Sequence, residues 1–494
     1  MTPTEEARAA AGVRRVGLNV ASLLAAYVLP RVFTVGAIVL AARVLGTERF
    51  GAYGAAAAFV VILSLLGTLG MHPLLVRDLA REPARAPRLV RAAHIVKSVA
   101  VALMLALVYA LSRWMGFRGE ALVAAMLLGV ASALGAYSEN LSAFFHATER
   151  MHVWAEASAL SGLVTGLLGA LLVLVTRSIP WFCAAAVAGQ AAALVWLLVR
   201  APAGVRWGEP SRGSDVARLA RALLPFAVGF VALTLHYKMD VLVLQKLRGA
   251  VDVGLYTAAY KFVDVFHALV LVGVTALFPR LARASTSAAD RVKAGERWAG
   301  TSVLEIVMLG AIPVGGALHL AAGPSVAALF GAQYAAAVPS VAWLALGLPA
   351  LAVNLLGGYL LGAAHRMGWM AGLYAFGLAL KTALDLFLMP RMGPAGAAMA
   401  MAAAEATLAV GVLIVLARVA HVAPSLRASL AGAGALALIG AARLVDDPSG
   451  GILTAAGYLI AVLSLYALAG LVGPRERRVL TRAMRDRQVL ADSP

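Results

Sequence analysis

Long apolar segments recur from one end of this chain to the other, and short polar connections separate them. An apolar segment of about 20 residues is long enough to cross a bilayer as a helix. On this criterion the sequence predicts about 14 membrane-spanning helices. They fall at roughly residues 18–42, 51–73, 92–112, 120–145, 155–176, 180–199, 222–245, 253–279, 300–322, 335–362, 368–390, 394–417, 427–445 and 451–472. Strands of a membrane β-barrel alternate over only about 10 residues, so a barrel is excluded.

The pattern therefore predicts an all-α integral membrane protein. One connection, residues 200–221, is rich in Gly, Pro, Ser and Arg, and it separates the first six helices from the next six. Six is an even number, so the two lobes have the same orientation and form a parallel repeat around a central cavity. We expect four parts, which are an N-lobe (1–199), a cytoplasmic linker (200–221), a C-lobe (222–420), and two further helices with a basic cytoplasmic tail (421–494).

An internal repeat supports this division. When residues 46–60 are aligned with residues 249–263, seven positions are identical. The identical pairs are Gly46 and Gly249, Gly51 and Gly254, Tyr53 and Tyr256, Ala55 and Ala258, Ala56 and Ala259, Phe59 and Phe262, and Val60 and Val263. A helical hairpin near the start of the chain is thus repeated about halfway along it. Internal repeats are typical of secondary transporters, whose substrate site lies between the two halves.

Composition and charge agree with a membrane protein. Hydrophobic residues make up 62% of the chain and charged residues 13%, and the net charge is +18. In a soluble protein this charge would suggest nucleic acid as a partner. Here about 29 of the 42 Lys and Arg residues, Lys97 among them, fall on one side of the predicted membrane and about 9 on the other. The bias places both termini in the cytoplasm and the positive charge against anionic lipids, so no nucleic-acid partner is needed.

Ionisable side chains inside the predicted spans are the candidate functional residues. Such a side chain costs several kcal/mol unless it faces a cavity or a partner. Four candidates lie near the middle of their spans, namely Arg31, Lys261, Asp264 and Glu405. Four more lie in the outer half, namely Lys238, Asp240, Lys381 and Asp385. The nine histidines show no metal-ligand spacing, and no phosphate-binding loop is present, so we expect neither a metal, nor a cofactor, nor ATP coupling.

Four segments resemble the Wzx-type bacterial polysaccharide flippases. LGTERFGAY at 45–53 is similar to the Leu-Gly-x-x-x-Phe-Gly-x-Tyr hairpin of that family. Residues 219–266, 329–368 and 386–406 resemble later parts of the same family, in the same order. The resemblance extends over about residues 20–420 and implies membership of the multidrug/oligosaccharidyl-lipid/polysaccharide exporter superfamily. It also implies a transporter, not an enzyme, in the bacterial cytoplasmic membrane.

The substrate implied by this resemblance is an oligosaccharide linked to undecaprenyl pyrophosphate. Alternating access would carry it from the inner to the outer leaflet for polysaccharide biosynthesis. Its partners would be membrane lipids, glycosyltransferases and a polysaccharide polymerase. The pyrophosphate requires cations, and the predicted substrate-binding residues are Arg31, Lys238, Lys261 and Lys381. The carboxylates predicted to couple transport to an ion or proton are Asp240, Asp264, Asp385 and Glu405.

Several alternatives stay open at this point. Lys261 with Asp264, and Lys381 with Asp385, have helical spacings that put each pair on one face, so each pair could simply neutralise itself. A multidrug antiporter of the same superfamily would use acidic residues without matched cations. A lipid II flippase would be expected to carry several arginines in its first helix, whereas this chain has only Arg31 there. A membrane glycosyltransferase or polymerase would need a large catalytic outer loop, and a scaffold would leave the buried charges unexplained.

Overall fold

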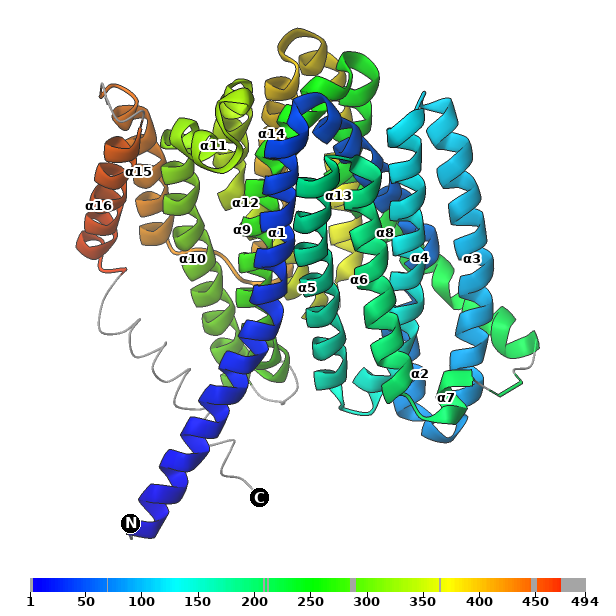
Figure 1. The fold of residues 1–494 in the computed structure, drawn as a ribbon. Helices are drawn as coiled ribbons and strands as arrows, with labels where there is room; N and C mark the ends of the chain where they lie inside the picture. The colour runs from blue at the N-terminus through cyan, green and yellow to red at the C-terminus, as the bar shows by residue number, and fades with distance from the viewer. Residues whose placement is uncertain are drawn as a thin grey trace.

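The computed structural model describes residues 3–68, 70–207, 209–210, 213–284, 290–363, 366–445 and 451–471. Every regular element within these ranges is helical, which confirms the predicted fold class (Figure 1). The predicted basic tail after residue 472 lies outside them. The first ten α-helices are α1 (Pro3–Thr68), α2 (Met71–Arg81), α3 (Ala86–Trp114), α4 (Gly119–Ala147), α5 (Met151–Thr176), α6 (Ile179–Arg200), α7 (Ala203–Trp207), α8 (Gly213–Arg248), α9 (Ala250–Ala284) and α10 (Asp290–Leu320).

The second part of the chain adds α11 (Ala322–Phe330), α12 (Val338–Ala363), α13 (Met367–Met392), α14 (Pro394–Val415), α15 (Leu426–Ala442) and α16 (Ile452–Leu468). In the described part of the chain, nine helical segments are long and apolar enough to cross a membrane, and α15 and α16 are shorter apolar helices. Each predicted span falls on a helix, and α1 carries the first two. These two are separated at Gly46, whose φ of 76° and ψ of 173° are not helical.

Two of the predicted connections contain helices. In residues 74–91, between the second and third predicted spans, α2 runs from Met71 to Arg81 and α3 begins at Ala86. The predicted linker 200–221 contains α7 and the start of α8. For α2 the reason is amphipathicity, because its apolar residues recur at helical spacing while its arginines face outward. The buried side chains of α2 are Met71, Leu74, Leu75 and Leu79. A criterion based on long apolar runs therefore does not detect this short arginine-rich helix.

The helices form two groups. In the first group α1 packs on α4 and α5, α6 packs on α4 and α5, and α3 packs on α4. In the second group α12 packs on α9, α10 and α14, and α13 packs on α8 and α14. The short helices α15 and α16 pack against α10 at the edge of the second group (Figure 1). The exact boundaries at residues 199, 221 and 420 stay predictions.

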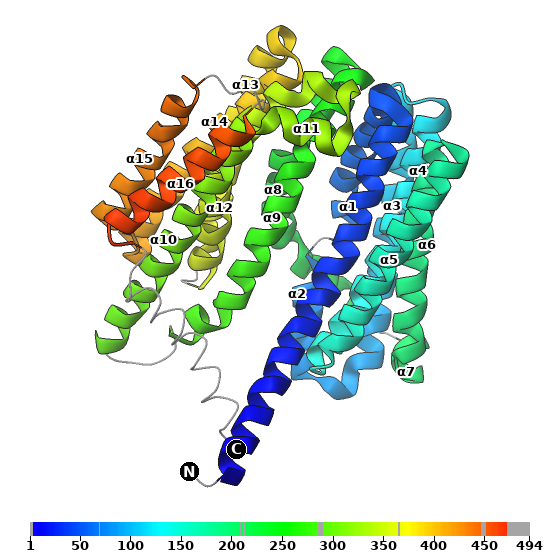
Figure 2. The same cartoon turned by 60° about the vertical axis from the view of Figure 1, so that its left-hand side comes forward.

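The two groups meet mainly at one end of the molecule. This end, here called the turn end, carries the Gly46 and Gly249 turns and α11. Figure 2 shows the second group close to the first near α11 and further from it toward the N-terminus of α1. The contacts between the groups are made chiefly by α1 with α8 and α9. Charged residues on these three helices are therefore placed where the two groups face each other.

Candidate functional site

A fully buried charge cluster lies between α8 and α13. Lys381 Nζ is 3.0 Å from Asp240 Oδ2 and 3.6 Å from Asp385 Oδ2, and these side chains are at most 2% exposed. Asp240 also accepts hydrogen bonds from the Tyr256 hydroxyl at 2.5 Å and from the Val241 backbone N–H at 2.8 Å. Asp385 Oδ1 is buried with no hydrogen-bond partner. Two carboxylates and one ammonium give this cluster one excess negative charge.

Sequence spacing predicted the Lys381–Asp385 pair but not Asp240, which is the nearer partner of Lys381. Asp240 comes from another helix, so only tertiary packing brings it to Lys381. The buried position also means that Lys381, one of the predicted substrate-binding residues, offers no ammonium surface to a substrate in this conformation.

Glu405 forms a second buried cluster on α14. Its Oε1 atom is 3.1 Å from His236 Nε2 on α8. Asn354 of α12 donates its Nδ2 hydrogens to Glu405 Oε2 at 2.6 Å and to the Glu405 backbone carbonyl at 3.0 Å. An imidazole and an amide thus hold this carboxylate, and His236 was not among the predicted site residues. Sequence reasoning could have found it only as an unexplained histidine inside a predicted span.

A third group is only partly buried. Lys261 Nζ lies 2.5 Å from Asp264 Oδ2, and Lys238 Nζ lies 3.8 Å from Asp264 Oδ1. The three side chains are 20–35% exposed. Lys238 also lies over the Tyr260 ring, with its Nζ atom 4.4 Å from the ring centroid, a distance suited to a cation–π interaction. Two lysines therefore share a single carboxylate.

Arg31 is exposed on α1, which belongs to the first group of helices, whereas the clusters above belong to the second. Among the described residues it makes no ion pair. His267 of α9 lies close enough to Arg31, Lys238, Asp264 and Glu405 to interact electrostatically with all four. The His267 ring stacks on the Tyr237 ring, with the ring centroids 6.1 Å apart. Arg31 thus lies within electrostatic reach of the charges of the second group.

These partly exposed groups lie at similar depths. At about 1.5 Å per helical residue, Lys238 and Lys261 are about 17–18 Å from Gly249 along their helices, and Arg31 is about 22 Å from Gly46. The hydrocarbon core of a bilayer is about 30 Å thick. All three cations are therefore near the middle of the membrane, Lys238 included, which was predicted in the outer half of its span.

One buried charge was missed in the first group of helices. Lys97 was counted among the cytoplasmic cations, but α3 buries it completely. Its Nζ atom donates to Glu139 Oε2 at 2.9 Å and to the Ala136 carbonyl at 2.8 Å. Glu139 is still 28% exposed, so this pair keeps some access to water.

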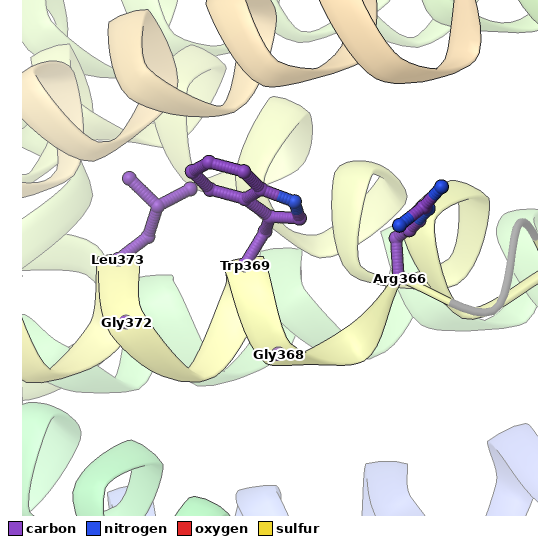
Figure 3. A pocket seen from close by; sticks show the side chains of 5 residues that line it. All are labelled: Arg366, Gly368, Trp369, Gly372 and Leu373. Atoms are coloured by element: carbon purple, nitrogen blue, oxygen red, sulfur yellow. The ribbon is translucent and has the colours of Figure 1, made fainter.

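A cavity of about 600 Å³ lies apart from these clusters, at the start of α13. Its lining includes Arg366, Trp369 and Leu373, and Gly368 and Gly372 leave its floor without side chains (Figure 3). The side chains of Trp369 and Leu373 point away from the green and blue helices at the foot of this view. None of the predicted site residues lines the cavity.

Comparison with known proteins decides the family. The sequence profile described as "polysaccharide biosynthesis protein" matches residues 16–285, which is more than half of the chain. The chain belongs to the polysaccharide biosynthesis protein family. The succinoglycan biosynthesis transport protein ExoT of Rhizobium meliloti is 27% identical over 376 residues, covering 72% of this chain and 68% of the relative.

Two solved structures show that the fold is that of membrane transporters. A lipid II flippase MurJ in an inward closed conformation has a TM-score of 0.70 at 15% identity, and the match covers 94% of this chain and 99% of that one. An inward-facing multidrug resistance MATE family transporter of the MOP superfamily has a TM-score of 0.66 at 16% identity, with 79% and 94% covered. This member of the polysaccharide biosynthesis protein family is thus a multi-pass membrane protein with a fold similar to those of a lipid II flippase and a MATE family transporter.

Proposed function

We propose that the protein is a flippase for a lipid-linked oligosaccharide. It moves the headgroup of an undecaprenyl-pyrophosphate-linked oligosaccharide from the inner to the outer leaflet of a bacterial cytoplasmic membrane, with both chain termini in the cytoplasm. Glycosyltransferases supply this substrate on the inner side, and a polymerase uses it on the outer side. Family membership and the relative named as a polysaccharide transport protein support this proposal.

The observation that carries the proposal is an excess of positive charge among the partly exposed groups. Lys238 and Lys261 share the carboxylate of Asp264 near the middle of the membrane, and Arg31 makes no ion pair within the described part of the chain. Uncompensated cations at this depth are costly unless an anion is bound there. A pyrophosphate supplies that anion and suits arginine and lysine donors. An organic-cation antiporter needs the opposite excess.

We assign the two fully buried clusters to energy coupling. Asp240, Asp385 and Lys381 together lack one positive charge, which a proton or a monovalent cation would supply. Glu405 is held by His236 and Asn354 and is equally shielded from a substrate. In this assignment Lys381 is a resident counter-charge for the two carboxylates, whereas substrate contact belongs to Arg31, Lys238 and Lys261. Binding and release of the small ion would then bias the two groups of helices between conformations.

The transport cycle follows from the arrangement of the two groups of helices. The headgroup enters between them from the cytoplasmic side while the lipid tail stays in the bilayer. Asp264 holds the two lysines in place until the pyrophosphate takes over as their counter-ion. Separation of the groups at the turn end then releases the headgroup on the outer side.

The test is binding of a fluorescent undecaprenyl-pyrophosphate oligosaccharide to the purified protein in nanodiscs. We expect saturable binding that weakens about 10- to 100-fold in Arg31→Ala and in Lys261→Ala, because each loses a charged hydrogen-bond donor worth about 1.5–3 kcal/mol. The matched control is Arg391→Ala, an exposed arginine that lies over the Phe387 ring. Its affinity should equal that of the wild type.

The contrary result would come from a cationic dye such as ethidium, measured in parallel. Binding of the dye alone, unaffected by Arg31→Ala and lost in Asp264→Asn, would replace the flippase with an antiporter. Equal loss of lipid binding in the Arg391→Ala control would show that the effect is one of overall surface charge.

A further inference from the structure

The two repeated hairpins meet each other at the turn end. Each turns at a glycine with positive φ, 76° at Gly46 and 87° at Gly249, a region that glycine enters without strain. These glycines are equivalent in the internal repeat. After each turn the chain enters a helical segment, residues 47–68 of α1 and the start of α9, and these two segments pack together.

Their crossing has a local two-fold symmetry. A Cβ added to Gly51 would lie 2.8 Å from the Gly254 backbone nitrogen and would clash with the Ala250 carbonyl. A Cβ added to Gly254 would lie 3.1 Å from the Gly51 nitrogen and would clash with the Thr47 carbonyl. Thr47 and Ala250 are equivalent in the repeat, as are Gly51 and Gly254. The same contact is therefore made twice, once from each side.

One turn further on, the next pair repeats this symmetry. A Cβ built on Gly54 would lie 3.1 Å from the Cβ of Thr257, its own equivalent in the repeat. A pair of equivalent residues in contact lies on or near the axis that relates the two halves. The two helices therefore approach closely at successive small residues over at least two turns.

Longer side chains surround this crossing on both sides. Arg43 of α1 donates its Nε hydrogen to the Leu329 carbonyl at 2.7 Å and also bonds the Ala328 carbonyl, at the end of α11. Lys246, the repeat equivalent of Arg43, lies over the Trp114 ring of α3 at 5.5 Å. Each basic residue thus reaches across to the opposite group of helices. Tyr334 adds a hydrogen bond to the Ala42 carbonyl at 3.0 Å.

We propose that this symmetric crossing is the outer gate of the transporter, closed in this structure, and that Gly51 and Gly254 are its positioning residues. This inference rests on the proposed function. Lys261 follows Thr257 by one helical turn, about 6 Å along α9, so the crossing closes directly over the partly exposed cations. Only residues without a Cβ allow the two backbones to approach this closely, and the crossing must separate for the headgroup to leave.

The first test locks the crossing. Gly54→Cys with Thr257→Cys places two Cβ atoms 3.1 Å apart, so the helices need to separate by only about 0.4 Å to reach the separation of about 3.5–4.5 Å found in disulfides. The one native cysteine, Cys183, is buried. We expect an oxidant to join the pair in membranes, to lower transport of the labelled lipid-linked oligosaccharide at least tenfold in proteoliposomes, and a reductant to restore it. Each single-cysteine variant should transport equally with and without oxidant.

The second test opens the crossing. Gly51→Ala and Gly254→Ala should each lower transport at least tenfold at unchanged protein amount, and should reduce the yield of the 54–257 disulfide. Gly36→Ala on the same helix α1 is the matched control, because nothing lies within 4 Å of a Cβ added there. Its transport and disulfide yield should equal those of the wild type.

Two results would overturn the gate. One is continued transport at the unlinked rate by protein in which the 54–257 disulfide is confirmed. The other is failure of the cysteine pair to join in a folded protein, which would show that the contact does not form. Absence of lipid-linked oligosaccharide transport by the wild-type protein would instead refute the proposed function.

Discussion

The two copies of the repeated hairpin share their backbone contacts but differ in their charges. In the second copy, α8 and α9 carry two lysines and two aspartates at or near the middle of the membrane. The repeat places apolar residues at all four equivalent positions of α1. The pairs are Lys238 with Val35, Asp240 with Ala37, Lys261 with Ala58, and Asp264 with Val61.

This difference separates the residues that bring the two helices together from the charged residues. Gly51 and Gly254 are glycine in both copies, since a Cβ at either position would push the two helices apart. The charged positions are under no such symmetric constraint. The repeat thus gives the two halves matching backbones at the crossing, while the second half carries most of the residues that we propose for substrate binding and coupling. The first half contributes Arg31 to the partly exposed cations.

The largest expected effect comes from the buried cluster of the second half. Lys381→Met removes the ammonium and leaves Asp240 and Asp385 buried without a counter-charge. We expect a loss of about 3–5 kcal/mol in the free energy of unfolding, measured by denaturation of the purified protein in detergent. Adding Asp385→Asn to Lys381→Met should recover part of this loss, because one buried charge is then removed. An unchanged stability in Lys381→Met would mean that water reaches the cluster.

The corresponding change in the first half should be milder. Lys97→Met breaks the pair with Glu139, but the partly exposed carboxylate can take water in place of the ammonium. We expect a loss of about 1–3 kcal/mol in the same denaturation measurement. Transport per folded molecule should stay near the wild-type level, because Lys97 belongs to neither proposed site. A loss of stability as large as that of Lys381→Met would erase the difference between the halves.

The smallest effect is expected at the rim of the crossing. Arg43→Gln removes exposed hydrogen bonds to the end of α11, and exposed charged contacts contribute about 0.2–1 kcal/mol. We expect the closed conformation to lose up to about fivefold in population, measured as a lower rate of 54–257 disulfide formation. Lys246→Gln, the repeat equivalent, should act in the same direction. Opposite effects of the two variants would show that the rim is not symmetric.

Much of the architecture could be predicted because it depends on local pattern. A helix that crosses a bilayer must satisfy its own backbone hydrogen bonds, so apolar length alone locates it. The pattern failed at α2, where amphipathic spacing over only 11 residues does not reach the length criterion. It also misplaced Lys97, because counting charges near the ends of spans cannot show which face of a helix is buried.

The contacts of the candidate site also fall into two classes, those that sequence spacing predicts and those that it does not. The helical spacings of Lys261 with Asp264 and of Lys381 with Asp385 predict contacts within one helix, and the structure contains both. The contacts of Asp240 with Lys381 and of His236 with Glu405 join residues far apart in the chain. No spacing rule applies to such pairs, and they depend on how each helix is rotated about its axis.

Apolar segment length, the distribution of arginine and lysine, and the repeated glycine pattern thus determined the helices, the class of protein and the existence of two related halves. Each of these is a property of a single segment or of two segments compared letter by letter. The pairing of buried charges, the sharing of one carboxylate by two lysines and the symmetric crossing at Gly51 and Gly254 were decided only when the helices packed. The physical reason is that burial and ion pairing depend on neighbours in space.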